Sequence, residues 1–184
     1  MSVNASQAAF PDCTMRPDFT LMTGQMFGNK PVNISCQDAI KGRNTGRLIY
    51  IERGHSLAEG IQRLQLLNYS YDKLFSIDHW QRSRITYKVL GKYYSMGSNE
   101  QKISTGVFAV ILAYFYGAHP IVMSGFSFST GGHVYDRTQH KRYHVSVDKA
   151  ALLRARALKL PFYAADRNFS LESGLPEWTG HEVQ

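Results

Sequence analysis

The chain lacks most features that mark specialised classes of protein. Cys13 and Cys36 are its only cysteines and show no metal or redox spacing, so two reduced thiols are the simpler interpretation and a single disulfide stays open. The longest apolar run, at residues 107–118, falls short of the about 20 residues that span a bilayer. The first residues have neither the charged segment nor the apolar core of a signal peptide. We therefore expect a cytoplasmic globular protein.

Acidic residues are also scarce. There are 14 Asp and Glu against 21 Lys and Arg, which gives a formal net charge of +7, and basic residues are densest from 137 to 159. This balance suits nucleotides, nucleic acid or an anionic membrane surface, although an ordinary solvated basic surface explains it equally well. Because no Asp-x-Asp pair occurs, we expect no divalent cation held by paired carboxylates on a phosphate.

The common nucleotide and metal motifs are absent as well. Neither a GxxxxGK[ST] nor a GxGxxG sequence occurs. His133, His140 and His144 include an i, i+4 pair that could bind zinc, but there is no HExxH pattern and the segment shows no helical periodicity. The sequence therefore predicts no metal site.

The most informative stretch that is present runs from residue 102 to 128. Ser104 or Thr105 can begin a helix, an apolar run continues to Tyr116, and Gly117 suits a helix end. Residues 121–123 then read as a short buried strand. A buried helix that leads into a buried strand is half of a crossover unit, so we expect an α/β fold with a mostly parallel sheet.

Other segments fit this architecture. We expect strands at residues 18–23, 47–52 and 162–165. One helix should follow Ser56, which forms a capping box with Glu59, and another should cover residues 145–160 with Ser146 as its cap. The pattern at residues 71–77 and 85–94 is weaker and is interpreted as helical.

Two positions carry candidate chemistry. The amides that begin the helix at Ser104 and Thr105 can bind an anion, and helix capping by these hydroxyls is compatible with that role. His144 directly precedes a helix, whose positive N-terminus disfavours imidazolium and leaves a ring that can accept a proton. An ordinary surface histidine is the alternative. Asp148, one turn later, could orient the ring or only complement the helix dipole.

Four stretches, taken in order, resemble a known family. They are Lys-Ile-Ser-Thr-Gly-Val at residues 102–107, Ser-Gly-Phe-Ser-Phe at 124–128, Tyr-His at 143–144 and Asp-Lys-Ala-Ala-Leu at 148–152. Their order and spacing are similar to those of the bacterial sialyltransferases of glycosyltransferase family 42 and, more distantly, to the small motif of family 29. Residues 1–23 resemble the strand–Asn–loop–strand region of that family more loosely.

The resemblance implies an α/β fold with a Rossmann-like, mostly parallel sheet flanked by helices, a variant of the GT-A fold. It implies one domain over residues 1–184, without the first strand and glycine-rich loop of the family. The expected activity is transfer of a sugar, most simply sialic acid, from its cytidine monophosphate ester to a saccharide hydroxyl, with inversion and without a metal. By this resemblance His144 is the catalytic base, Ser129 replaces a second phosphate-binding tyrosine, and the nucleotide-binding positions are Asn4, Thr23 (in place of an asparagine), Lys102, Ser104, Thr105, Gly106 and Tyr135.

The resemblance also implies partners. We expect a nucleotide-sugar donor, a saccharide or glycolipid acceptor as in the synthesis of cell-surface polysaccharide, and peripheral contact with the inner face of the membrane. We expect no cofactor and no nucleic acid, and homo-oligomerisation is left open. The alternatives are a transferase for another nucleotide sugar, a non-catalytic relative that binds nucleotide or glycan, and a nucleic-acid-binding protein with steeply salt-dependent binding.

Overall fold

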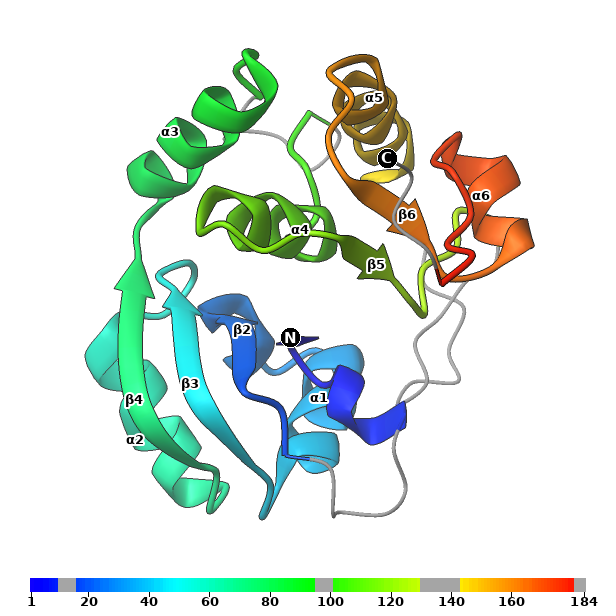
Figure 1. The fold of residues 1–184 in the computed structure, drawn as a ribbon. Coiled ribbons are helices and arrows are strands. Elements are labelled where there is room, and N and C mark those ends of the chain that lie inside the picture. The colour runs from blue at the N-terminus through cyan, green and yellow to red at the C-terminus, as the bar shows by residue number, and fades with distance from the viewer. Residues whose placement is uncertain (10–15, 95–100, 130–142, 181–184) are drawn as a thin grey trace. The chain divides into compact units, whose positions relative to one another are not determined.

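The computed structural model describes residues 1–9, 16–94, 101–129 and 143–180, and these form two compact units (Figure 1). Unit 1 contains residues 1–81, and unit 2 contains residues 82–129 and 143–180 of the described chain. Each unit is an α/β structure with parallel strands, which confirms the predicted fold class. The prediction of a single domain stays a prediction.

Unit 1 is built on a four-stranded parallel sheet with the order β1-β2-β3-β4. The strands are β1 (Ser2–Val3), β2 (Phe19–Thr23), β3 (Asn44–Ile51) and β4 (Ser70–Ile77). The connections contain η1 (Ser6–Ala9), η2 (Gly24–Phe27), α1 (Pro31–Ile40) and α2 (Leu57–Leu66). Ser56 caps α2 and forms the predicted capping box with Glu59.

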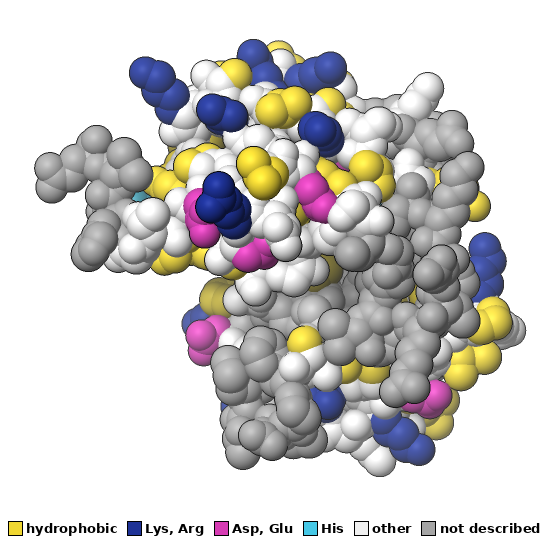
Figure 2. Space-filling model, turned by 90° about the vertical axis from the view of Figure 1, so that its right-hand side faces the viewer, with side chains coloured by type: hydrophobic (Ala, Val, Ile, Leu, Met, Phe, Trp, Pro, Cys, Tyr) yellow, Lys and Arg dark blue, Asp and Glu magenta, His cyan; other side chains and the backbone are white. Residues whose placement is uncertain are grey.

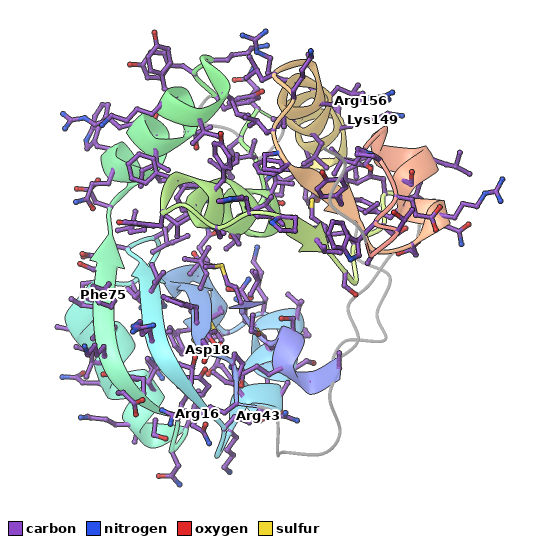
Figure 3. All side chains as sticks on the ribbon, in the orientation of Figure 1. Arg16, Asp18, Arg43, Phe75, Lys149 and Arg156 are labelled. Carbon is purple, nitrogen blue, oxygen red and sulfur yellow. The ribbon has the colours of Figure 1, made fainter. Side chains whose placement is uncertain are left out.

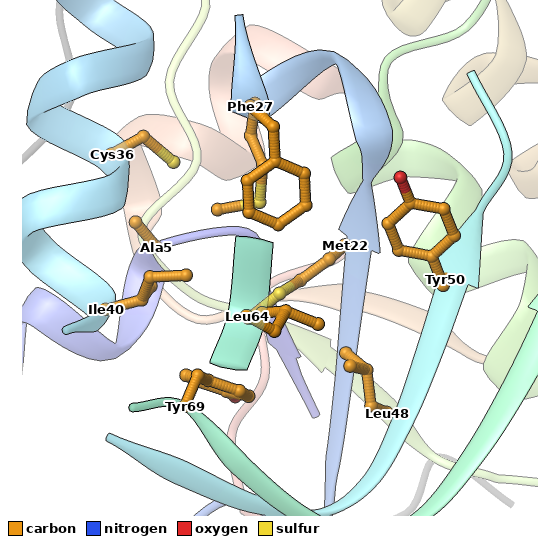
Figure 4. Close-up of a cluster of buried hydrophobic side chains, with 10 residues drawn as sticks. Ala5, Met22, Phe27, Cys36, Ile40, Leu48, Tyr50, Leu64 and Tyr69 are labelled. Atoms are coloured by element: carbon orange, nitrogen blue, oxygen red, sulfur yellow. The ribbon is translucent and has the colours of Figure 1, made fainter. Parts of the chain in front are cut away.

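The core of unit 1 lies between this sheet and its helices (Figure 4). Side chains alternate along a strand, so Leu48 and Tyr50 of β3 lie on one face, where they meet α1 and α2. The buried members of the cluster are Ala5, Met22, Met26, Phe27, Cys36, Ile40, Leu48, Tyr50, Leu64 and Tyr69.

Gly60 of α2 provides a stability test, because Tyr50 packs directly on it. A Cβ at position 60 would lie 2.5 Å from Cζ of the fully buried Tyr50 ring. Glycine to alanine in a helix usually stabilises by roughly 0.8–1 kcal/mol. Here the clash with Tyr50 makes the substitution destabilising instead. We expect Gly60→Ala to lower the free energy of unfolding by about 1–3 kcal/mol in denaturant titrations. The cost should shrink in a Tyr50→Leu background; an equal cost in both backgrounds would contradict the packing argument.

Unit 2 combines helices with a two-stranded parallel sheet. The helices are α3 (His79–Leu90, which enters the unit at Arg82), α4 (Thr105–Phe115), α5 (Val145–Ala157) and α6 (Arg167–Ser173). Strands β5 (Ile121–Met123) and β6 (Phe162–Ala164) pair in parallel, with Ile121 opposite Phe162. Six consecutive residues of α4, from 107 to 112, are buried, as expected for a helix without a polar face, whereas Phe115 and Tyr116 are exposed.

Several sequence predictions were wrong. Residues 71–77 form strand β4, because pairing with β3 outweighs a three-to-four spacing of apolar residues that imitates a helix. The helix predicted at residues 85–94 begins earlier, at His79. His144, rather than Ser146, occupies the N-cap position of α5. Helices α1 and α6 were not predicted.

Candidate functional site

The N-terminus of α4 is the centre of the candidate site in unit 2. Ser104 is its N-cap, and the hydroxyl accepts a hydrogen bond from Val107 N at 3.2 Å. The next two amides, of Thr105 and Gly106, have no acceptor inside a helix. Within the described part of the chain, no other group accepts from them either. They are therefore donors that an anionic ligand could use.

Gly106 also shapes this helix end. A Cβ there would lie 2.7 Å from Cε1 of Phe126, which follows β5. Phe126 in turn stacks on Phe169 of α6, with ring centroids 5.5 Å apart. The absence of a side chain at Gly106 therefore lets the loop after β5 pack against the start of α4.

Three side chains hold the backbone of residues 102–104. Arg82 Nη2 donates to Ile103 O at 2.7 Å and to Ser104 O at 3.2 Å. Asp148 Oδ1 accepts from Ser104 N at 2.7 Å, and His144 Nδ1 lies 2.9 Å from Lys102 O. These contacts come from α3, α5 and the α5 N-cap, so the segment that leads into α4 is fixed from separate elements of unit 2.

The contact with Lys102 O determines the tautomer of His144. A carbonyl oxygen only accepts, so Nδ1 must carry the proton. The neutral ring then has its lone pair on Nε2, which is the atom that could act as a base. His144 is half-buried, and its side chain makes no capping hydrogen bond to α5. The geometry is thus compatible with the predicted role as proton acceptor.

Asp148 bonds to the α4 N-cap rather than merely complementing the α5 dipole. The residue is 6% exposed, and its carboxylate accepts from Ser104 N. We expected the amides that begin this helix, that of Ser104 included, to bind an anion. The Ser104 amide is instead bound by Asp148, which leaves the amides of Thr105 and Gly106.

Lys102 is the most unusual residue at the site. It is 4% exposed, and within the described chain its Nζ has no hydrogen-bond partner. A buried ammonium group without a partner is costly. An anion bound beside it would offset that cost.

Arg82 is the site residue that the sequence reasoning missed. It is 4% exposed, and its guanidinium lies 4.9 Å from the ring centroid of Phe108. A sequence signal could have identified it, because Arg82 lies three residues before the buried Ile85 and therefore on the apolar side of α3. An arginine on a buried helical face must find acceptors, and here they are the carbonyls of residues 103 and 104.

Asn4 and Thr23 lie together in unit 1, at the carboxyl ends of β1 and β2. Asn4 has a positive φ of 48° and its Oδ1 accepts from Thr23 N at 3.1 Å. Thr23 is 8% exposed, and its hydroxyl has no hydrogen-bond partner in the described residues. The carboxyl edge of a parallel sheet is where ligands bind in such folds. The main observed role of Asn4 is to join the two strand ends.

Tyr135, the last of the expected nucleotide-binding residues, falls outside the described residues. His133 and His140, which were considered as zinc ligands, do so as well. Among the residues that are described, no three His, Cys, Asp or Glu come together as a metal site. In the same part of the chain, no helix is long and apolar enough to cross a membrane.

Glu172 of α6 organises the loop after β5. Its carboxylate accepts from Phe128 N at 2.5 Å, from Ser127 Oγ at 3.2 Å and from the Ser129 hydroxyl. These donors, the Phe128 amide first, hold the pKa of Glu172 below its ordinary value of 4.5, against a smaller opposing effect of burial. The loop and α6 line a hollow of about 470 Å³.

This pKa shift predicts a pH dependence of stability. Because the folded-state pKa is depressed, the stabilisation is present above pH 4.5 and is lost as the pH falls through the folded-state value. We expect the free energy of unfolding to fall more steeply below pH 4.5 in the wild type than in Glu172→Gln, measured by denaturant unfolding. Parallel pH profiles of the two proteins would contradict the contribution of this carboxylate.

Comparisons of the chain with protein-family models, with curated proteins and with solved structures find no match. The sialyltransferase-like interpretation therefore depends on the sequence stretches and on the arrangement of their residues in unit 2. That arrangement joins a buried lysine without a hydrogen-bond partner among the described residues, a helix N-terminus and a histidine of defined tautomer.

Proposed function

We propose that the chain is a glycosyltransferase that moves a sugar, most simply sialic acid, from a cytidine-monophosphate-activated donor to a saccharide hydroxyl. The observation that carries the proposal is the hydrogen bond between His144 Nδ1 and Lys102 O. This contact supports the proposal because it holds the imidazole beside the segment that leads into the α4 N-terminus, where an anion would bind.

In the proposed reaction, His144 Nε2 takes the proton of the acceptor hydroxyl. The acceptor oxygen forms a bond to the anomeric carbon on the face opposite the phosphate. The bond from that carbon to the phosphate oxygen breaks, and its electron pair leaves with cytidine monophosphate. Displacement from the opposite face inverts the anomeric configuration.

The departing phosphate gains negative charge, which needs stabilisation by positioned donors. The amides of Thr105 and Gly106 are suitable because the described chain leaves them without acceptors. Lys102 supplies a buried positive charge two residues before the helix cap. No step of this mechanism requires a cofactor.

Thr23 differs from the asparagine that the resemblance implies at this position. This difference supports a second candidate function, a transferase that uses a different nucleotide sugar. Its hydroxyl is buried and has no partner in the described chain, so a ligand group could satisfy it. A threonine offers a shorter polar group than the asparagine that the resemblance leads one to expect. A relative that binds nucleotide without catalysis would use the same residues.

Calorimetric titration tests the proposal at the level of binding. We expect saturable binding of cytidine monophosphate that persists in EDTA. Thr105→Ala should weaken it by about 0.5–1.5 kcal/mol if its hydroxyl donates one neutral hydrogen bond to the nucleotide. Uridine and guanosine monophosphates serve as controls, and tighter binding of either would move the proposal to the other donor class. Absence of binding by any nucleotide would contradict it.

A further inference from the structure

Unit 2 carries an exposed surface of aromatic and basic side chains that the proposed reaction does not use. It is formed by α3 and the residues just after it, together with the C-terminal end of α4 (Figure 1). Four aromatic residues are exposed: Tyr87 by 43%, Tyr93 by 64%, Phe115 by 37% and Tyr116 by 73%. We call this the aromatic–basic surface; its members are Arg84, Tyr87, Lys88, Lys92, Tyr93, Phe115 and Tyr116.

The contacts within the unit show that these residues are neighbours. The rings of Tyr87 and Tyr93 stack with centroids 4.2 Å apart and an angle of 13°. Lys88 Nζ lies 5.7 Å from the centroid of the Phe115 ring, which joins α3 to the end of α4. Tyr116 packs edge-on against Phe115 at 5.3 Å. The surface is therefore continuous across the two helices.

Its charge is of one sign. Between Asp78 and Asp136 the sequence has a single acidic residue, Glu100. No acidic residue occurs on α3 or α4, while Arg84, Lys88 and Lys92 are exposed. On the face shown in Figure 2, by contrast, acidic side chains lie close to several of the basic ones. A partner of the aromatic–basic surface should therefore be anionic.

We propose that this surface binds the anionic headgroup region of a lipid bilayer. Exposed tyrosines with lysine and arginine beside them suit a membrane interface, where the rings meet the apolar boundary and the cations meet lipid phosphates. A second copy of the chain is a poorer partner, because a two-fold interface would place these cations against themselves. Single-stranded nucleic acid is also less suitable, because base stacking needs open ring faces. Here Tyr87 and Tyr93 each cover one face of the other ring, and Lys88 lies over Phe115.

Co-sedimentation of the full chain with vesicles tests this proposal. We expect binding to vesicles of phosphatidylcholine mixed with phosphatidylglycerol, weakened by salt, and little binding to phosphatidylcholine alone. Lys88→Gln combined with Lys92→Gln should lower the partition coefficient roughly thirtyfold. Tyr93→Ala combined with Tyr116→Ala should lower it as well, while both double variants keep the thermal stability of the wild type.

The matched control is Lys149→Gln combined with Lys159→Gln on and just after α5. These residues are exposed, and Lys149 is labelled in Figure 3. This control removes the same charge from residues outside the aromatic–basic surface and should leave vesicle binding within about twofold. Equal loss in the control and the Lys88/Lys92 variant would overturn the assignment to this surface. So would absence of vesicle binding, a dimer that Tyr116→Ala dissociates, or loss of oligonucleotide binding alone in the Lys88/Lys92 variant.

Discussion

Replacing His144 with alanine is expected to lower turnover by about 10²- to 10⁴-fold while the affinity for the cytidine nucleotide stays nearly unchanged. The base acts on the acceptor hydroxyl, whereas the phosphate is held by Lys102 and the α4 N-terminus. Single-turnover transfer to a labelled acceptor measures the chemical step, and calorimetric titration measures nucleotide binding.

Alanine at this position also removes the contact with Lys102 O, so a second variant is needed to separate the two roles. In His144→Asn the side-chain amide can still donate to that carbonyl, but no nitrogen can accept a proton. We expect this variant to be as inactive as His144→Ala and more stable than it. His119 offers a matched control, because it is exposed and its Nδ1 lies 3.0 Å from Gly117 O. Activity in His144→Asn that equals the wild type would refute the base assignment.

The fold was predictable where local and tertiary preferences agree. The apolar run of α4 could only be a buried helix, and Ser104 and Gly117 marked its ends. At β4 the preferences conflict, since the strand is mostly exposed and lacks the alternation of a half-buried strand. Its pairing with β3 settles the conformation, and this long-range contact has no signature in the local sequence. The short helix α6 differs, because it was missed although local signals mark both its ends, Asp166 as the N-cap and Gly174 as a left-handed C-cap.

Most residues of the candidate site were predictable from the sequence, but their hydrogen bonds were not. The sequence placed Ser104 and Thr105 at a helix start and His144 before another helix, and both positions are as expected. It could not show that Asp148 binds the Ser104 amide, because residues 44 apart along the chain meet only through packing. Arg82 was missed for the same reason, since its acceptors are backbone carbonyls 21 and 22 residues later.

Replacing Lys102 with methionine is expected to have opposite effects on stability and on binding. Methionine keeps most of the length of the side chain and removes a buried ammonium group that has no partner in the described chain. The unliganded protein should gain about 1–3 kcal/mol in the free energy of unfolding. The affinity for cytidine monophosphate should fall about 10- to 100-fold, because a charge-assisted hydrogen bond to the phosphate is lost.

Denaturant unfolding without nucleotide and calorimetric titration with it measure the two effects on one preparation. Lys149→Met is the control, because Lys149 is exposed on α5 and its loss should change neither quantity appreciably. If Lys102 only packs its aliphatic stem in the core, methionine should leave nucleotide binding intact. Cytidine monophosphate should also raise the thermal midpoint of the wild type more than that of Lys102→Met, because the ligand stabilises the folded state in proportion to the logarithm of its affinity. Opposite signs for unliganded stability and ligand affinity would thus identify Lys102 as a residue kept for an anion rather than for the fold.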